Sequence, residues 1–189
     1  SASGKLKGNN NVGGIVGLVE DGAAGTFSMT DCHYTGEEIS ASGTVGGLIG
    51  YVNGQWTISE SSVETDLTAT AGNCGGLLGS VVGNDLTGDN PATNNTSLNI
   101  SGSHYSGTLV AGANYVGGAI GRVNGTVKSL IVSKVYTTGS VKATQYVGGL
   151  IGAPMSKGPQ SLSDCWSSSD ITSELTGTVK VGGFMGVNT

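Results

Sequence analysis

The chain has 189 residues, of which only 11% are charged and 35 are glycine, and its formal net charge is −5. Soluble domains carry about 25% charged residues, so Ser, Thr, Asn and Gly must supply most of this surface. A single arginine, Arg122, and seven scattered lysines exclude the basic surface that nucleic acid requires. The apolar runs are only a few residues long, so we expect neither membrane insertion nor a signal peptide in this sequence.

A glycine-rich hexapeptide, V-G-G-x-x-G with Cys in place of Val once, occurs six times along the chain. Its copies begin at residues 12, 45, 74, 116, 147 and 181, and successive starts lie 33, 29, 42, 31 and 34 residues apart. Such a period is typical of solenoids, in which each repeat stacks on the next. The paired glycines allow neighbouring backbone to approach more closely than a Cβ permits.

Two further short apolar segments precede the hexapeptide in each of the later repeats. In chain order, the first segments contain Met29, Ile58, Ile100, Ile131 and Leu162, and the second contain Ile39, Leu67, Leu109, Val141 and Ile171. Turn-forming residues separate these segments, and no window suits an amphipathic helix, so the segments are predicted to be strands. We therefore predict an all-β protein, a parallel β-helix (β-solenoid) of about six coils with three short strands per ~30-residue coil. It would form a single domain over residues 1–189.

The longest interval contains an inserted loop at about residues 83–98, rich in Asn and Asp. Loops on a rigid scaffold often carry recognition residues, so Asp85 and Asp89 are candidate ligand contacts. An oxygen-rich loop could also hold calcium, although the D-x-D-x-D-G spacing of a calcium loop is absent.

Two copies of the hexapeptide continue into x-V-N-G, at residues 45–54 and 116–125. This sequence resembles the GLUG motif of bacterial surface proteins, which occurs in adhesin-like chains and in the repeat regions of immunoglobulin A peptidases. The resemblance implies an extracellular β-solenoid, at the cell surface or secreted, whose partner is a host or cell-surface glycan or protein. It transfers no catalytic residue, because the H-E-x-x-H signature of the peptidase is absent from this chain.

Counting from the first apolar residue of each repeat aligns Tyr34, Val63, Tyr105 and Tyr136 in one column. Tyr105 and Tyr136 would then lie on adjacent coils, where their rings could stack. Facing outward, they would form a platform for sugars or other flat ligands; facing inward, they would belong to an aromatic core. We favour the buried or half-buried arrangement, and the sequence leaves both open.

The same counting places Glu37 and Asp66 on adjacent coils. Stacked carboxylates repel unless a cation lies between them, so calcium is one interpretation. A glycosidase-like carboxylate pair is another, and a solvated acidic edge without any cofactor is the one we favour.

The cysteines and histidines predict no site. Three cysteines are an odd number, and Cys32 and Cys165 occupy the same repeat position in coils far apart, so we expect free thiols. Cys74 replaces the first valine of its hexapeptide. His33 and His104 also share a repeat position, but Ser62 occupies it in the coil between them.

The favoured function is a non-catalytic module of a bacterial surface protein that acts as an adhesive or spacer rod. No capping element is evident at either end, which indicates either a piece of a longer chain or a filament subunit that self-associates end to end. An ice-binding protein is an alternative, because Ser40 and Thr68 begin a possible threonine array that Val110 and Lys142 interrupt. A carbohydrate-active β-helix enzyme using Glu37 and Asp66 is the remaining alternative.

Overall fold

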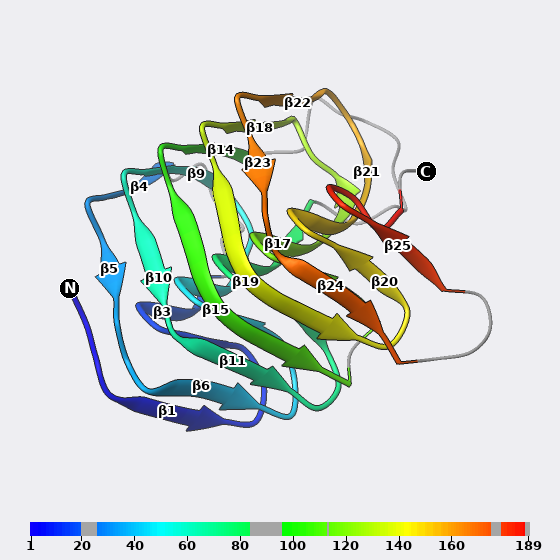
Figure 1. Cartoon of the computed structure of the whole chain (residues 1–189). Coiled ribbons are helices and arrows are strands. Elements are labelled where there is room, and N and C mark those ends of the chain that lie inside the picture. The colour runs from blue at the N-terminus through cyan, green and yellow to red at the C-terminus, as the bar shows by residue number, and fades with distance from the viewer. Residues whose placement is uncertain (20–25, 84–95, 113, 175–178, 188–189) are drawn as a thin grey trace.

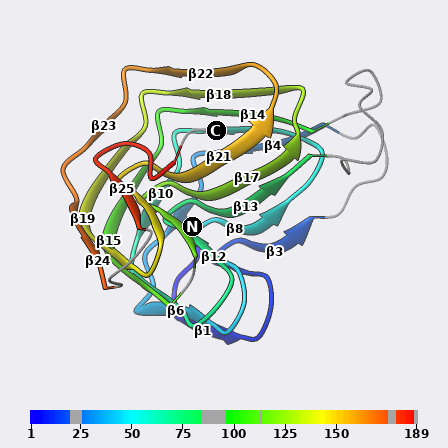
Figure 2. The ribbon, with the colours of Figure 1, turned by 90° about the vertical axis from the view of Figure 1, so that its right-hand side faces the viewer.

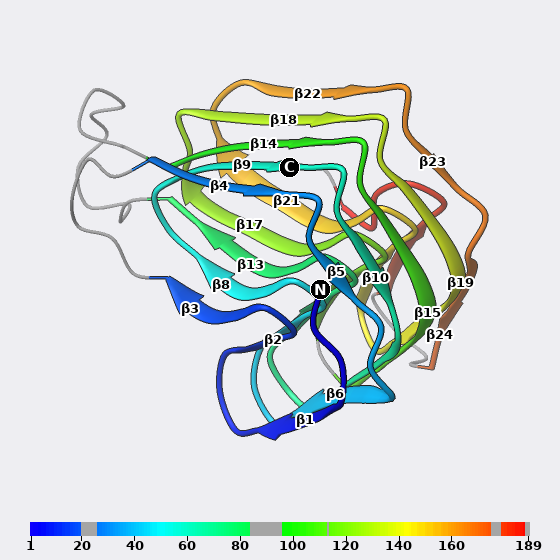
Figure 3. The ribbon, with the colours of Figure 1, turned by 90° about the vertical axis from the view of Figure 1, so that its left-hand side faces the viewer.

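The chain folds into a parallel β-solenoid of about five turns. The computed structural model describes residues 1–19, 26–83, 96–112, 114–174 and 179–187, and these residues contain strands and no helix. Figure 1 shows the coils stacked side by side from the N-terminal coil to the C-terminal coil, so the two termini lie at opposite ends of the stack. Figures 2 and 3 view the two ends. The predicted fold class is confirmed.

The strands form four sheets in which every pairing is parallel. Sheet A contains β1 (Lys5–Gly8), β5 (His33–Tyr34), β6 (Glu38–Ala41), β10 (Ser62–Glu64), β11 (Asp66–Ala69), β15 (His104–Ala111), β19 (Tyr136–Ala143), β23 (Trp166–Ser167) and β24 (Asp170–Ser173). Sheet B contains β2 (Val12–Gly13), β7 (Val45–Gly46), β12 (Asn73–Gly75), β16 (Tyr115–Gly117), β20 (Tyr146–Gly148) and β25 (Lys180–Gly182).

Sheet C contains β3 (Val16–Val19), β8 (Ile49–Val52), β13 (Leu78–Val82), β17 (Ile120–Thr126) and β21 (Ile151–Lys157). Sheet D contains β4 (Thr26–Thr30), β9 (Gln55–Ser59), β14 (Ser97–Ser101), β18 (Ser129–Ser133) and β22 (Gln160–Ser163). Each coil passes through the sheets in the order D, A, B and C, so three strands per coil is an underestimate. The hexapeptide spans a corner, because its first residues lie in sheet B and its last residues in sheet C.

The six hexapeptides lie in register along sheet B. Val45 pairs with Val12 and Cys74, and the same column continues through Val116 and Val147 to Val181. A Cβ built on Gly76 would collide with the Gly118 carbonyl oxygen and the Tyr105 ring. Glycine is therefore required at this position because the next coil and a core side chain both contact its backbone.

The corner between sheets D and A uses left-handed backbone in every coil. The residue two positions after the last inward residue of sheet D has a φ between 49° and 57° in all five coils: Asp31, Glu60, Gly102, Lys134 and Asp164. Four of these residues are not glycine, so neighbouring interactions must hold them in this conformation. In several coils, a hydrogen bond from the side chain of the following residue provides such an interaction. The Ser61 hydroxyl donates to the Ser59 carbonyl and accepts from the Cys32 N–H of the preceding coil.

Candidate functional site: an outer aromatic column

Three aromatic rings stack on the outer surface of sheet A. His104 in β15 pairs with Tyr136 in β19, which pairs with Trp166 in β23. The His104 and Tyr136 ring centroids are 4.6 Å apart with planes inclined by 3°, and those of Tyr136 and Trp166 are 4.7 Å apart, also at 3°. These distances are close to the spacing of neighbouring strands, so the parallel register itself aligns the rings. We call this set, with His33 and Ser62 of the preceding coils, the outer column.

Exposure differs along the outer column: His33 is half-buried and Ser62 is buried. His104 and Tyr136 are half-buried, whereas Trp166 is 49% exposed. Trp166 lies in β23, which among the described strands pairs only with β19, so one face of its ring has no neighbouring strand to cover it. Figure 1 shows β19 and β23 adjacent on the face of the stack turned toward the viewer.

Polar groups surround the N-terminal part of the outer column. His33 Nδ1 lies 2.7 Å from Ser62 Oγ, and His33 Nε2 lies 3.0 Å from Asp31 Oδ1. His104 Nε2 lies 3.8 Å from Glu64 Oε1. Stacked rings bordered by hydrogen-bonding groups match the lining of many ligand sites, where aromatic faces provide area and a few polar groups fix orientation.

The predicted stack of Tyr105 on Tyr136 is wrong. Tyr105 pairs with Val63 and Thr137, and it is completely buried. The core prediction therefore holds for Tyr105, whereas Tyr136 points outward one register position away. The connection between Ala143 and Tyr146 is one residue shorter than that between Ala111 and Tyr115, so counting back from the hexapeptide shifted this coil by one residue.

The same one-residue error in the counted register assigned the wrong one of two neighbouring apolar residues of sheet D to the core. Val132, not Ile131, pairs with Ile100 and is buried, and Ile131 is 42% exposed on the opposite face. A shift of one residue in a strand moves every side chain to the other face, which is why Tyr136 was misplaced.

The predicted pairing of Glu37 with Asp66 is also wrong. Asp66 pairs with Glu38, because the first coil has one more residue between Tyr34 and Ile39 than the second has between Val63 and Leu67. Lys5 Nζ lies 2.8 Å from Glu38 Oε2, and the hydrogen bond from Lys5 lowers the pKa of Glu38. Asp66 Oδ1 accepts the Thr108 N–H at 2.8 Å. Glu37 is exposed and lines one open hollow with Glu38 and Asp66.

The remaining acidic candidates do not define a cation site. Asp85 and Asp89 lie outside the described residues, and so does most of the predicted loop at 83–98. Across the parts of the chain that the structure describes, no group of three or more His, Cys, Asp or Glu side chains could hold a metal ion.

The three cysteines are free and belong to the scaffold. Cys32 and Cys165 occupy the corner position that Ser61 and Ser103 fill in other coils, and the Cys165 thiol donates to the Ser163 carbonyl at 3.2 Å. Cys74 is buried in sheet B, and burial raises the pKa of its thiol far above the usual range. That thiol therefore stays protonated and unreactive at neutral pH.

A second aromatic stack was missed from the sequence. Tyr115 and Tyr146 each precede a hexapeptide valine, and their ring centroids are 4.9 Å apart with an interplanar angle of 12°. The Arg122 guanidinium carbon lies 4.5 Å from the centroid of the Tyr115 ring. The signal was present as the dipeptide Tyr-Val at the start of two consecutive hexapeptides, at 115–116 and 146–147.

The fold and the outer column define the chain as a repetitive parallel β-solenoid with aromatic residues on its surface. The chain is similar to halomucin of Haloquadratum walsbyi (strain DSM 16790 / HBSQ001), with 32% identity over 166 residues. That match covers 80% of this chain but only 2% of halomucin. No family model matches the chain, and no solved structure matches it significantly, so the GLUG resemblance stays a prediction. The described residues also contain no helix long and apolar enough to cross a membrane.

Proposed function

We propose that the chain is a non-catalytic module of a cell-surface or secreted protein and acts as an adhesive rod that contacts a glycan through the outer column. The observation that carries this proposal is the parallel stack of His104, Tyr136 and Trp166 on the outside of the solenoid, which ends at the exposed Trp166 ring. The faces of sugar rings are apolar, and the exposed Trp166 ring at the end of the stack offers an aromatic face to such a ring, whereas both faces of Tyr136 are covered by its neighbours and support Trp166.

The fold and the comparison support the location. A β-solenoid is a rigid scaffold whose outward positions can vary without loss of the core. The name halomucin refers to a mucin, and a likeness to one stretch of it is compatible with a repetitive surface protein.

The non-catalytic part of the proposal rests on the acidic residues of sheet A. Glu38 is engaged by Lys5, and Asp66 by the Thr108 backbone, so neither is poised as the free acid or base of a glycosidase. Ice binding receives no support, because Val110 and Lys142 pair with each other in the column that contains Ser40 and Thr68.

A glycan array tests the adhesive role. The labelled chain is applied beside Trp166→Ala and Tyr136→Ala, and we expect each substitution to weaken binding of the recognised glycans at least about tenfold. Ile131→Ala is the matched control, because Ile131 is a similarly exposed apolar residue on sheet D. We expect it to bind as the unaltered chain does. The proposal is overturned if no glycan binds, or if Trp166→Ala binds the same glycans equally well.

End-to-end self-association is a separate prediction with a separate measurement. Sedimentation velocity at increasing protein concentration would show growing species for a filament subunit, whereas a rod that acts alone would keep one sedimentation coefficient.

A further inference from the structure

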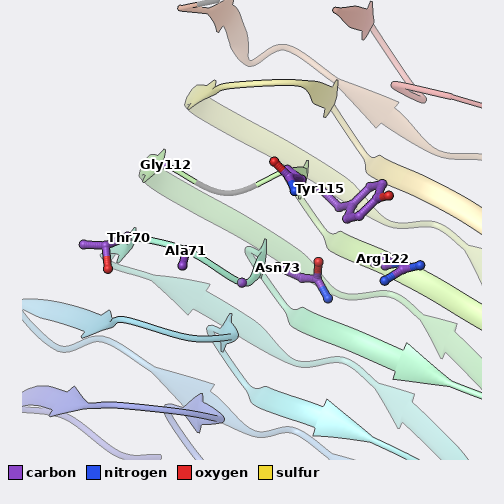
Figure 4. Close-up of a pocket in the computed structure, with 8 residues that line it drawn as sticks. Thr70, Ala71, Asn73, Gly112, Tyr115 and Arg122 are labelled. Carbon is purple, nitrogen blue, oxygen red and sulfur yellow. The ribbon is translucent and has the colours of Figure 1, made fainter.

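An open hollow lies beside Arg122, at the corner where sheet A turns into sheet B. It has a volume of about 340 Å³ and is lined by two consecutive coils (Figure 4). The lining residues are Thr70, Ala71, Gly72 and Asn73 of one coil, with Gly112, Asn114, Tyr115 and Arg122 of the next. The volume falls within the range of about 300–1,000 Å³ typical of small-molecule sites.

Arg122 is the sole charged residue among those lining residues, and it is the only arginine of an acidic chain. Within the described part of the chain it has no carboxylate partner, and its one hydrogen bond runs from Nη2 to Asn124 Oδ1 at 3.1 Å. Its Nε–H is buried with no acceptor there. A guanidinium has five N–H donors, so the Nη donors that Asn124 does not engage remain available to a ligand, whereas the buried Nε–H does not.

The guanidinium is held in place by an aromatic surface. Tyr146 of the next coil covers one face of the Tyr115 ring, so the Arg122 guanidinium, 4.5 Å from the ring centroid, covers the opposite face. Stacking on an aromatic ring fixes the plane of a guanidinium and leaves its edge free to donate. Figure 4 shows Tyr115 and Arg122 side by side at one end of the hollow, with Asn73 nearby.

We infer that this hollow binds the carboxylate of an acidic saccharide, a uronic acid unit within a glycan. A fixed guanidinium edge pairs with a planar carboxylate through two parallel hydrogen bonds. Thr70, Asn73 and Asn114 supply hydroxyl and amide groups that can hydrogen-bond the hydroxyls of the same sugar. The absence of Asp and Glu among the lining residues leaves nothing to repel the ligand.

This site is independent of the outer column. Arg122 extends from sheet C and contacts Asn124 of the same sheet and Tyr115 of sheet B, whereas Trp166 and Tyr136 lie in sheet A. A saccharide could therefore bind at the hollow even if the outer column bound nothing, and the reverse also holds.

Isothermal titration calorimetry with a hyaluronan octasaccharide, which carries glucuronate, tests the inference. Chitotetraose serves as a neutral saccharide and tetraglutamate as a carboxylate without sugar rings. We expect hyaluronan to bind, to weaken as salt rises because the charges are partly exposed, and to bind more tightly than either other probe. Arg122→Gln should weaken hyaluronan binding at least about tenfold, and Arg122→Lys about fivefold, because lysine lacks the planar fork.

Two controls keep the test specific. Lys128→Gln removes the same charge at an exposed position outside the hollow and should bind hyaluronan as the unaltered chain does. Trp166→Ala should also leave hyaluronan binding unchanged, which separates this inference from the proposed adhesive role. Amide shift mapping on the unaltered chain should place the largest changes at Asn73, Tyr115 and Arg122, whatever the stability of the variants.

Four results would overturn the inference. Equal binding of tetraglutamate would show that charge alone suffices and would exclude the saccharide. Equal binding of chitotetraose would exclude the carboxylate contact. Unchanged affinity in Arg122→Gln, or shift changes confined to other coils, would exclude the hollow.

Discussion

Two adjacent columns of sheet A change in opposite directions along the stack. The inner column contains Tyr34, Val63, Tyr105, Thr137 and Ser167, and the outer column contains His33, Ser62, His104, Tyr136 and Trp166. From the third coil onward the inner residues become smaller, from Tyr105 to Thr137 and Ser167, while the outer residues become larger, from His104 to Tyr136 and Trp166. Side chains that are neighbours in sequence therefore serve separate purposes, because one column fills the interior and the other covers the surface.

The interior compensates for the loss of its tyrosine rings with hydrogen bonds. In the third coil Tyr105 packs against Gly76, whereas in the fourth Thr137 donates to the Gly149 carbonyl at 2.6 Å and contacts Ser167 Oγ at 2.9 Å. The glycine of the hexapeptide therefore packs against an aromatic ring in one coil and accepts a hydrogen bond from a hydroxyl in another.

The largest expected effect comes from the glycine behind Tyr105. Gly76→Ala would place a methyl group against the Gly118 carbonyl oxygen and the Tyr105 ring, and it should lower the free energy of unfolding by about 3 kcal/mol or prevent folding. Gly183→Ala occupies the same hexapeptide position in the last repeat, where nothing lies within 4 Å of the added atom, and should cost under about 1 kcal/mol. Urea denaturation of both variants measures the difference. Equal losses would contradict the close packing described for the inner column.

The second-largest expected effect on stability comes from removing one aromatic ring from each column. Tyr105→Ala leaves a cavity in the core and should cost about 3–5 kcal/mol, whereas Tyr136→Ala removes a half-buried outer ring and should cost about 1 kcal/mol. The two free energies of unfolding, measured by denaturant titration, should therefore differ severalfold. A larger loss for Tyr136→Ala would reverse the assignment of the two faces.

The phenol hydroxyls give a smaller contrast within the inner column. Tyr34 donates to the Gly4 carbonyl at 2.6 Å, so Tyr34→Phe should cost about 1 kcal/mol. The Tyr105 hydroxyl is buried with no partner among the described residues, so Tyr105→Phe should be neutral or slightly stabilising. Thermal unfolding measures the stability of both variants. A loss of stability for Tyr105→Phe as large as that for Tyr34→Phe would contradict the assignment of the Tyr105 hydroxyl as unpaired.

The smallest expected effect concerns an exposed ion pair on the outer face of sheet A. Because the hydrogen bond from Lys5 lowers the pKa of Glu38, the contribution of this carboxylate is fully present above its unfolded pKa of about 4.5 and is lost as pH falls through the lower folded value. The melting temperature of the unaltered chain should fall slightly more over that range than that of Glu38→Gln. Identical pH profiles would show that the pair contributes nothing measurable, as for many exposed pairs.

The fold was predictable because six hexapeptides fix the period, and the register of sheet B follows them without exception. The site was less predictable, because connections between strands vary by one residue. The extra residue before Ile39 displaced Glu37 from Asp66, and the shorter connection before Tyr146 displaced Tyr136 from its true neighbours, His104 and Trp166. A period counted along the chain cannot detect such changes, whereas paired backbone hydrogen bonds reveal them directly.

The fluorescence of Trp166 tests the central claim most directly. Trp56→Phe leaves Trp166 as the only tryptophan, and phenylalanine keeps an aromatic ring against Phe27, on which Trp56 stacks. In this variant we predict solvent-exposed emission that acrylamide quenches readily. Adding the glycan that binds best on the array should shift the emission to shorter wavelength and reduce quenching. Emission and quenching that stay unchanged at a saturating glycan concentration would contradict the assignment of the outer column as the contact surface.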